Sequence, residues 1–343
     1  MGFGVRGQIP IPRGHVKTRL LHGEIHGNRD FLDSPGGAMT LRHAMKPLLA
    51  LILAFFPLAL AAAEEKPVKG IDINLVPETT AIVRGKPFTV GVKIHHHEGF
   101  HTYWKNPGIA GVPVKLQWEL PEGFSAGPIQ WPYPEKTLMA IHPVHGFKRD
   151  VMLLVEITPP AEIRSARVTL KASASWMACA DGCYPGKKTL SCEVPVAPEA
   201  TVDPAVAGAF QKAREELPQP LQGWSAELLS APGAQEIRFR LTPAAGNAAQ
   251  PGELYFFSSD GQISSAPPQR VVKTDSAYEI AAERSPYGPK SKSSLPGVLI
   301  SSTPFTKDGP KFATIEPRAA GAEVTKETVV APAAEKECDC GKE

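Results

Sequence analysis

Two cysteines with three residues between them have the type and spacing best suited to chemistry in this chain. Cys179 and Cys183 flank an Asp-Gly turn, so their Cα atoms can come within the roughly 4.4 to 6.8 Å that a disulfide requires. Such a short loop adds little stability by restricting the unfolded chain. Close spacing instead favours thiol–disulfide exchange, because each thiol can resolve a mixed disulfide formed by the other. A purely structural disulfide is the alternative, and a closed zinc site would need further ligands.

The remaining cysteines give weaker signals. Cys192 alternates with Leu190 and Val194 on one strand face, which predicts a buried core thiol rather than a third exchange partner. Cys338 and Cys340 form a Cys-x-Cys pair near the end of the chain. That pair suits a soft metal or electron exchange, and incidental thiols on a disordered tail are the alternative.

The histidines beyond residue 63 are confined to residues 95–145. His95 and His97 share a face of a predicted strand, and His101 follows closely, so the three side chains are candidate ligands for copper or zinc. Polar histidines at a strand end are the other interpretation. The chain has no Ser-His-Asp order, HExxH or phosphate-binding loop beyond residue 63. No motif in that part of the sequence therefore supports a hydrolase or a kinase.

The elements that must position these side chains are short strands. Apolar and polar residues alternate over 88–94 and 168–176, and this period of two predicts antiparallel sheets with one buried face. Residues 237–241 and 254–257 predict a second set of strands. Between the two sets, Asp203-Pro204 can begin a helix whose apolar positions repeat at helical spacing. Those positions are Val206, Phe210, Ala213 and Leu217.

The composition agrees with an all-β globular protein. The 343 residues are 42% hydrophobic and 21% charged, which excludes disorder as the main state. A net charge of +2 gives no electrostatic basis for nucleic-acid binding. The 35 prolines and 30 glycines have no period, which excludes collagen and favours strands joined by turns.

The first sixty residues have the order of a secretory signal. Arg42 and Lys46 precede an apolar run at 48–60 that ends in small residues, and this run is shorter than the roughly 20 residues that span a bilayer. Met39 or Met45 is then the start, and the preceding sequence is an upstream extension. We expect cleavage after Ala63, a periplasmic mature protein with no membrane span, and oxidising surroundings for the cysteines.

Several motifs in order resemble the periplasmic N-terminal domain of the DsbD family, and most closely its ScsB-like, copper-tolerance branch. They are HTYWKNPG at 101–108, GVP at 111–113, WELPEGF at 118–124, QWPYP at 130–134 and CADGCYP at 179–185. The resemblance covers roughly residues 68–198. Residues 255–261, with Gln269 after them, resemble the second β domain of ScsB-like proteins.

The resemblance implies an immunoglobulin-like sandwich whose pair, Cys179 and Cys183, relays electrons from a membrane partner to disulfides of periplasmic proteins. The family also covers its cysteines with a loop that carries an aromatic residue. The corresponding stretch here is 143–147, which makes His145 and Phe147 candidates for shielding or tuning the pair. No membrane region or thioredoxin-like domain accompanies the motifs, so the expected donor is a separate membrane protein of the DsbD or CcdA type.

Together these observations predict two immunoglobulin-like antiparallel β-sandwich domains joined by a short helix. The predicted boundaries are an upstream extension at 1–44, a signal peptide at 45–63, a redox domain at 64–198, a helical linker at 199–221, a second sandwich at 222–317 and a disordered tail at 318–343. The predicted function is thiol:disulfide interchange without a bound cofactor, and with no nucleic acid as partner. The competing class is a binding protein, either a copper-holding envelope protein or an adaptor whose disulfide is structural.

Overall fold

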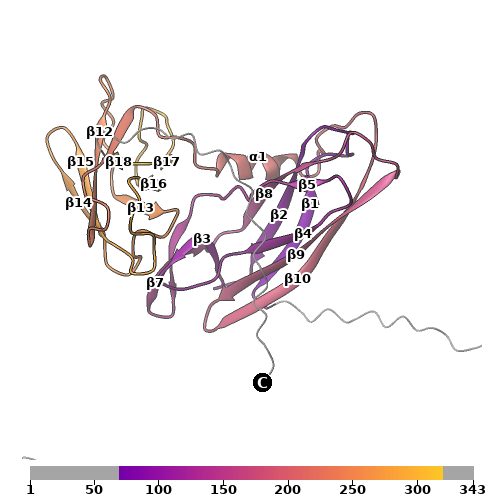
Figure 1. Cartoon of the computed structure of the whole chain (residues 1–343), viewed down its shortest axis with the longest axis horizontal. Helices are drawn as coiled ribbons and strands as arrows, with labels where there is room; N and C mark the ends of the chain where they lie inside the picture. The colour runs from indigo at the N-terminus through magenta and orange to yellow at the C-terminus, as the bar shows by residue number, and fades with distance from the viewer. Residues whose placement is uncertain (1–68, 320–343) are drawn as a thin grey trace, which may run out of the picture. The chain divides into compact units, whose positions relative to one another are not determined.

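The computed structural model describes residues 69–319 as β-strands and one short α-helix (Figure 1). The first ten strands are β1 Ile71–Pro77, β2 Phe88–His96, β3 Thr102–Gly108, β4 Lys115–Glu119, β5 Ser125–Ala126, β6 Glu135–Met139, β7 His142–Phe147, β8 Val151–Thr158, β9 Arg167–Cys179 and β10 Cys183–Pro195. After helix α1, Ala207–Glu215, come β11 Trp224–Leu228, β12 Glu236–Pro243, β13 Leu254–Ser258, β14 Arg270–Lys273, β15 Tyr278–Glu283, β16 Gly297–Ser301, β17 Phe312–Ile315 and β18 Arg318–Ala319. We refer to β1–β10 as the N-terminal strands and to β11–β18 as the C-terminal strands.

The N-terminal strands form three antiparallel sheets. The orders are β1-β2-β8-β5, β10-β9-β4 and β3-β7-β6. Side chains of the first two sheets share one apolar core, in which Val92, Leu153 and Leu170 are fully buried. The predicted alternation over 168–176 is confirmed, since Val168 to Trp176 bury every second side chain. Burial of one face of each sheet is what stabilises this arrangement, because apolar area removed from water is the main favourable term.

The longest hairpin carries the cysteine pair at its tip. Strands β9 and β10 are paired in register from Val194 opposite Val168 to Cys183 opposite Cys179. The turn that joins them contains Asp181, as the sequence predicts. A rigid two-stranded ladder therefore holds the two cysteines opposite each other.

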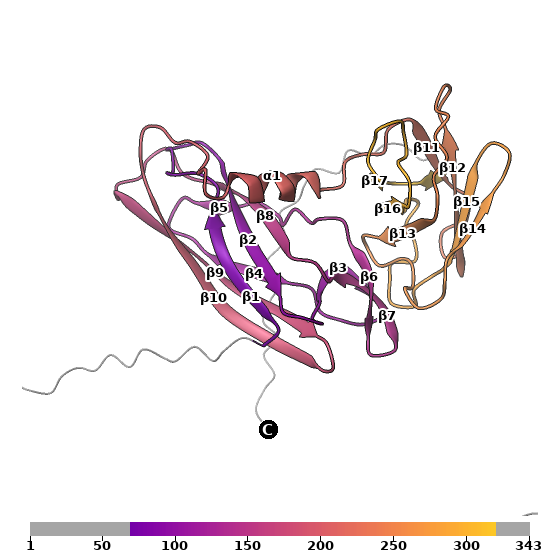
Figure 2. The same ribbon diagram turned by 180° about the vertical axis from the view of Figure 1, so that it is seen from behind.

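Helix α1 begins later than the sequence predicts. Residues 203–206 form a turn in which the Asp203 side chain accepts a hydrogen bond from the backbone N–H of Ala205, and the helix starts at Ala207. Its predicted apolar face is confirmed, because Phe210 and Ala213 are buried against strand β8. Both ribbon views show α1 running along β8 (Figure 2).

The C-terminal strands form a five-stranded sheet, β14-β15-β12-β11-β18, and a three-stranded sheet, β13-β16-β17. Their pairs are antiparallel except for the parallel pair of β11 with β18. Phe239, Phe256 and Leu299 are among the fully buried side chains between them. Phe257 of β13 belongs instead to the core of the N-terminal strands, so apolar packing continues from one set of strands to the other.

The prediction of antiparallel sheets with one short helix is therefore confirmed. The immunoglobulin-like form and the boundaries at 198, 221 and 317 stay predictions. The upstream extension, the signal peptide, Cys338 and Cys340 lie outside the described residues. Within residues 69–319, no helix is long and apolar enough to cross a bilayer.

Candidate redox site

The cysteine pair is a disulfide with one buried and one exposed half. Cys179 ends β9 and Cys183 begins β10, and a disulfide joins them across a Cα–Cα distance of 4.2 Å. Only 1% of Cys179 is accessible to solvent, whereas Cys183 is exposed. A thiol that approaches from solvent therefore reaches Cys183 more readily than Cys179.

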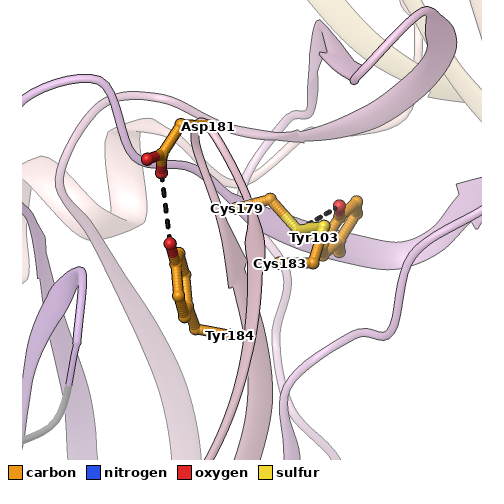
Figure 3. Close-up of a disulfide and its surroundings, with 5 residues drawn as sticks. All are labelled: Tyr103, Cys179, Asp181, Cys183 and Tyr184. Carbon is orange, nitrogen blue, oxygen red and sulfur yellow. Dashed lines mark hydrogen bonds between the residues drawn. A yellow bond between two sulfur atoms is a disulfide. The ribbon is translucent and has the colours of Figure 1, made fainter. Parts of the chain in front are cut away.

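A tyrosine hydroxyl contacts the buried sulfur. The hydroxyl of Tyr103 on β3 donates a hydrogen bond of 2.9 Å to the Sγ atom of Cys179 (Figure 3). Burial raises the pKa of Tyr103 to about 12, so the phenol keeps its proton and stays a donor at neutral pH. A donor at this position stabilises negative charge on the Cys179 sulfur, because hydrogen bonding to the charged form favours that form.

The backbone of β3 fixes this contact. His101, just before β3, exchanges two backbone hydrogen bonds of 3.0 Å with Cys179, and Tyr103 lies two residues further on. Gly111 has a φ of +103°, and a Cβ atom there would lie 2.2 Å from the Tyr103 ring. Glycine at 111 is thus required both for the backbone conformation and for the close approach of the tyrosine.

Apolar side chains complete the surroundings of the buried sulfur. Tyr103, Val144 and Cys179 form one small buried cluster, and Met139 and Met177 pack against it. Val144 lies on β7, the neighbour of β3 in its sheet. The Cys179 sulfur is therefore enclosed by side chains from β3 and β7 as well as by its own strand.

The turn between the cysteines has its own contacts. The Tyr184 hydroxyl donates a hydrogen bond of 3.3 Å to the Asp181 carboxylate, as Figure 3 shows. The Tyr184 ring lies 5.9 Å from the Phe100 ring, and the Nζ atom of Lys69 lies 3.7 Å from its centroid. These contacts hold the turn while leaving Cys183 accessible.

The two residues predicted to shield the cysteine pair, His145 and Phe147, contact other side chains. His145 bonds to the hydroxyl of Tyr255 at 3.0 Å, and burial lowers the pKa of His145 to about 4. Phe147 is buried and stacks on Trp131. The residue of that segment in the cluster with Cys179 is Val144, so a shielding or tuning role for His145 and Phe147 stays a prediction.

The histidine cluster is divided between surface and interior. His95 and His97 are exposed and face Asp150 at 2.7 Å and Asp72 at 3.4 Å. His101 is buried, and burial together with the charge of Lys148 lowers its pKa. Within the described part of the chain, no three His, Cys, Asp or Glu side chains are placed to hold one metal ion. A copper site that uses the tail cysteines stays a prediction.

Cys192 lies on the predicted face of β10. It is only half-buried rather than fully enclosed, and it is not in a disulfide. Burial raises the pKa of its thiol to about 11. A thiol that stays protonated at neutral pH is a poor nucleophile, which fits a core residue rather than an exchange partner.

No pattern in the sequence assigns a role to Tyr103 or Val144. Both lie in segments used for the family resemblance, HTYWKNPG and PVHGF, but their roles depend on pairing between distant strands. Burial of the Tyr103 phenol, which requires a hydrogen-bond partner, is visible only in the structure.

The N-terminal strands, which hold the half-exposed disulfide at a hairpin tip, coincide with the segment that matches a known protein family. Residues 73–194 match the family model of the N-terminal part of the thiol:disulfide interchange protein DsbD. This segment of the chain is a DsbD N-terminal domain.

Solved structures give the same answer for the fold. The crystal structure of the N-terminal periplasmic domain of ScsB from Proteus mirabilis superimposes with a TM-score of 0.52 at 15% identity, over 74% of this chain and 96% of that chain. The I67–I69 fragment of titin aligns at 9% identity over 74% of this chain and 66% of that one, with a TM-score of 0.18. No curated protein sequence matches the chain significantly.

Proposed function

We propose that this chain is a periplasmic thiol:disulfide interchange protein that relays electrons through Cys179 and Cys183. The observation that carries the proposal is the asymmetric disulfide, in which exposed Cys183 is joined to buried Cys179. A structural bridge gains from burial of both sulfur atoms. An exchange protein needs one sulfur open to attack and a neighbour that can resolve the mixed disulfide.

Reduction of the pair begins at Cys183. A thiolate of a reduced donor attacks the Cys183 sulfur, a donor–Cys183 disulfide forms, and the Cys179–Cys183 bond breaks. Cys179 leaves as a thiolate, which the Tyr103 hydroxyl stabilises at 2.9 Å. A second donor thiolate then attacks the donor sulfur of the mixed disulfide, closes the donor's own disulfide and releases Cys183 as a thiolate. Two electrons have passed to the pair, and the thiolates take up protons from solvent.

Delivery of the electrons is the reverse sequence on another partner. The Cys183 thiolate attacks the disulfide of an acceptor, and the first acceptor sulfur leaves as a thiolate. Cys179 then attacks the Cys183 sulfur, which closes the disulfide of the pair and releases the second acceptor sulfur. The acceptor gains the two electrons, and the pair is oxidised again. Exposed Cys183 is thus the sulfur that meets both partners, and buried Cys179 is the resolving thiol.

The partners follow from this chemistry and from the family. The donor is a separate membrane electron-transfer protein of the DsbD or CcdA type, and the acceptors are disulfide-containing periplasmic proteins. The periplasm is supported by the likeness of the fold to the N-terminal periplasmic domain of ScsB, and by the disulfide, since such bonds persist in oxidising compartments. The predicted signal at 45–63 would deliver the chain to that compartment.

The reduction potential of the pair tests this function. Cys192, Cys338 and Cys340 are replaced by serine, and the protein is equilibrated in glutathione or dithiothreitol buffers before thiol trapping. A reversible potential within about −120 to −270 mV, the range of exchange proteins, supports the relay. A value below about −300 mV marks a structural bridge and overturns the proposal in favour of an adaptor.

A further inference from the structure

Strands β3 and β7 lie between the disulfide and the C-terminal strands. Tyr103 on β3 and Val144 on β7 belong to the cluster that encloses Cys179. Their chain neighbours face the other way: the Trp104 ring lies 6.2 Å from Phe257, and the His145 ring lies 4.7 Å from the same phenylalanine. Alternation along a strand thus gives each of the two strands one face on the redox site and one face on β13.

Two polar contacts from the C-terminal strands and their loops hold β7 on either side of Val144. The Ser265 hydroxyl donates a hydrogen bond of 2.7 Å to the carbonyl oxygen of Pro143. The Tyr255 hydroxyl and the Nε2 atom of His145 share a hydrogen bond of 3.0 Å. Because Pro143 and His145 are the immediate neighbours of Val144, these two bonds fix the backbone that places Val144 against Cys179.

The β3 side of the sheet is held by the same elements. The Ser265 hydroxyl also accepts a hydrogen bond of 3.0 Å from the backbone N–H of Ile109. The Asn106 side chain donates one of 2.6 Å to the carbonyl oxygen of Ser258. Ser265 therefore joins β7 to the end of β3 through one hydroxyl group, and neither strand can move away from the C-terminal strands without breaking these bonds.

We propose that Tyr255 and Ser265 are positioning residues that keep β7, and with it Val144, closed over the Cys179 sulfur. The C-terminal strands thereby take part in the exchange reaction, and this role rests on the proposed function. The closure of β7 over Cys179 does not depend on that function. We call the contacts of Tyr255 with His145 and of Ser265 with Pro143 the brace. While the brace is closed, attack is directed to exposed Cys183, and the resolving thiol of Cys179 is protected from unrelated oxidants and thiols. The brace acts through Val144 and touches neither sulfur.

Selective alkylation of Cys179 tests the brace. In a background where Cys183, Cys192, Cys338 and Cys340 are serine, the rate of Cys179 modification by iodoacetamide is measured with and without Tyr255→Phe and Ser265→Ala. Tyr255→Phe removes one hydrogen bond that the open form does not make, and Ser265→Ala removes two, those to Pro143 and Ile109. We therefore expect the rate to rise by roughly fivefold for Tyr255→Phe, which is the effect of a typical net hydrogen bond, and by at least as much for Ser265→Ala. The matched controls are Tyr278→Phe and Ser225→Ala, because these hydroxyls bond to Gln250 and to the Thr242 carbonyl.

A parallel measurement on Cys183, in a background where Cys179 is serine, checks that the variants leave the exposed cysteine unchanged, and circular dichroism separates opening of the brace from loss of the fold. Opening raises the Cys179 rate and leaves the Cys183 rate and the circular dichroism spectrum unchanged, whereas loss of the fold changes the spectrum of the variant. A Cys179 rate that stays within twofold of the parent in a variant that combines Tyr255→Phe with Ser265→Ala overturns the brace. The proposed function fails instead on the reduction potential of the pair, so the two failures are distinguishable.

Discussion

The Tyr103 hydroxyl on β3 donates a hydrogen bond to the Sγ atom of Cys179, a residue 76 positions later in the chain, at 2.9 Å. It is the polar contact that the structure shows to the buried sulfur. A thiolate is a stronger hydrogen-bond acceptor than a disulfide sulfur, because it carries a full charge. The hydroxyl therefore stabilises the reduced pair more than the oxidised pair.

Tyr103→Phe should make the pair harder to reduce. The variant keeps the ring in its buried position and removes only the hydrogen bond, whose net contribution is about 1 kcal/mol. Since 30 mV corresponds to about 1.4 kcal/mol for two electrons, we expect the potential to become more negative by about 20 mV. Equilibration in glutathione buffers measures the shift.

Tyr184→Phe is the matched control for this change. It removes the hydroxyl that bonds to Asp181 at 3.3 Å, close to the same disulfide but not to the Cys179 sulfur. Its potential should stay at the parent value. Equal shifts in both variants would mean that the Tyr103 hydroxyl has no specific effect on the pair.

The arrangement of the cysteine hairpin was predictable because its signals are local. Alternation over 168–176 and an Asp-Gly turn specify two strands that meet at Cys179 and Cys183, and the ladder between β9 and β10 has that register. The helix face was predictable for the same reason, since its apolar positions repeat within one short segment. Its start was predicted too early, because Asp203 and Pro204 form a turn before the helix.

The surroundings of the disulfide were not predictable from local patterns. Tyr103 reaches Cys179 because His101 pairs with the end of β9 through an isolated bridge, and such pairing leaves no mark in the sequence near either residue. Val144 is likewise an ordinary apolar strand residue until β7 is placed beside β3. Only contacts between distant segments distinguish these two residues from other buried side chains.

Phe210→Ala should destabilise the protein without changing the redox site. The Phe210 ring is fully buried and packs with Met152 and Leu154 in a core separate from the disulfide. Removing a buried aromatic ring typically costs about 3 to 5 kcal/mol. Urea unfolding should show this loss, while the potential of the pair stays constant. Gln211→Ala, on the exposed side of the helix, is the control, and a loss of similar size there would contradict packing as the cause.

The stability of the protein should fall as the pH is lowered from about 6.5 to about 4. Burial lowers the pKa values of His96 and His145 to about 4 from 6.5. Between these values the unfolded chain binds protons that the folded protein excludes, so acid favours unfolding, by roughly 3 kcal/mol per histidine at the limit. Urea unfolding at about pH 7 and about pH 4.5 measures the difference.

Replacement of one buried histidine assigns the effect. His145→Gln should remove part of the pH dependence. His95→Gln should not remove it, because the pKa of exposed His95 is raised by its hydrogen bond to Asp150. A group whose pKa is raised in the folded protein stabilises the fold at low pH, and this stabilisation is lost as the pH rises. The pH dependence from His95 therefore has the opposite sign to that from His145. An unchanged slope in His145→Gln would show that this histidine is not the source.

Single-cysteine variants should differ strongly in their reaction with an aromatic disulfide. With Cys192, Cys338 and Cys340 replaced by serine, Cys179→Ser leaves Cys183, which is exposed, and Cys183→Ser leaves Cys179, which is 1% accessible. We expect Cys183 to form the mixed disulfide about tenfold faster or more, because exchange requires access to the attacking thiolate. The coloured thiolate released by the reagent gives both rates, and urea-unfolded samples provide the reference in which both thiols are exposed. Equal rates in the folded variants, or a faster Cys179, would contradict entry of electrons at Cys183. A large difference that disappears in urea would instead assign the selectivity to the fold, with Cys183 as the sulfur that partners meet and Cys179 as the thiol that resolves.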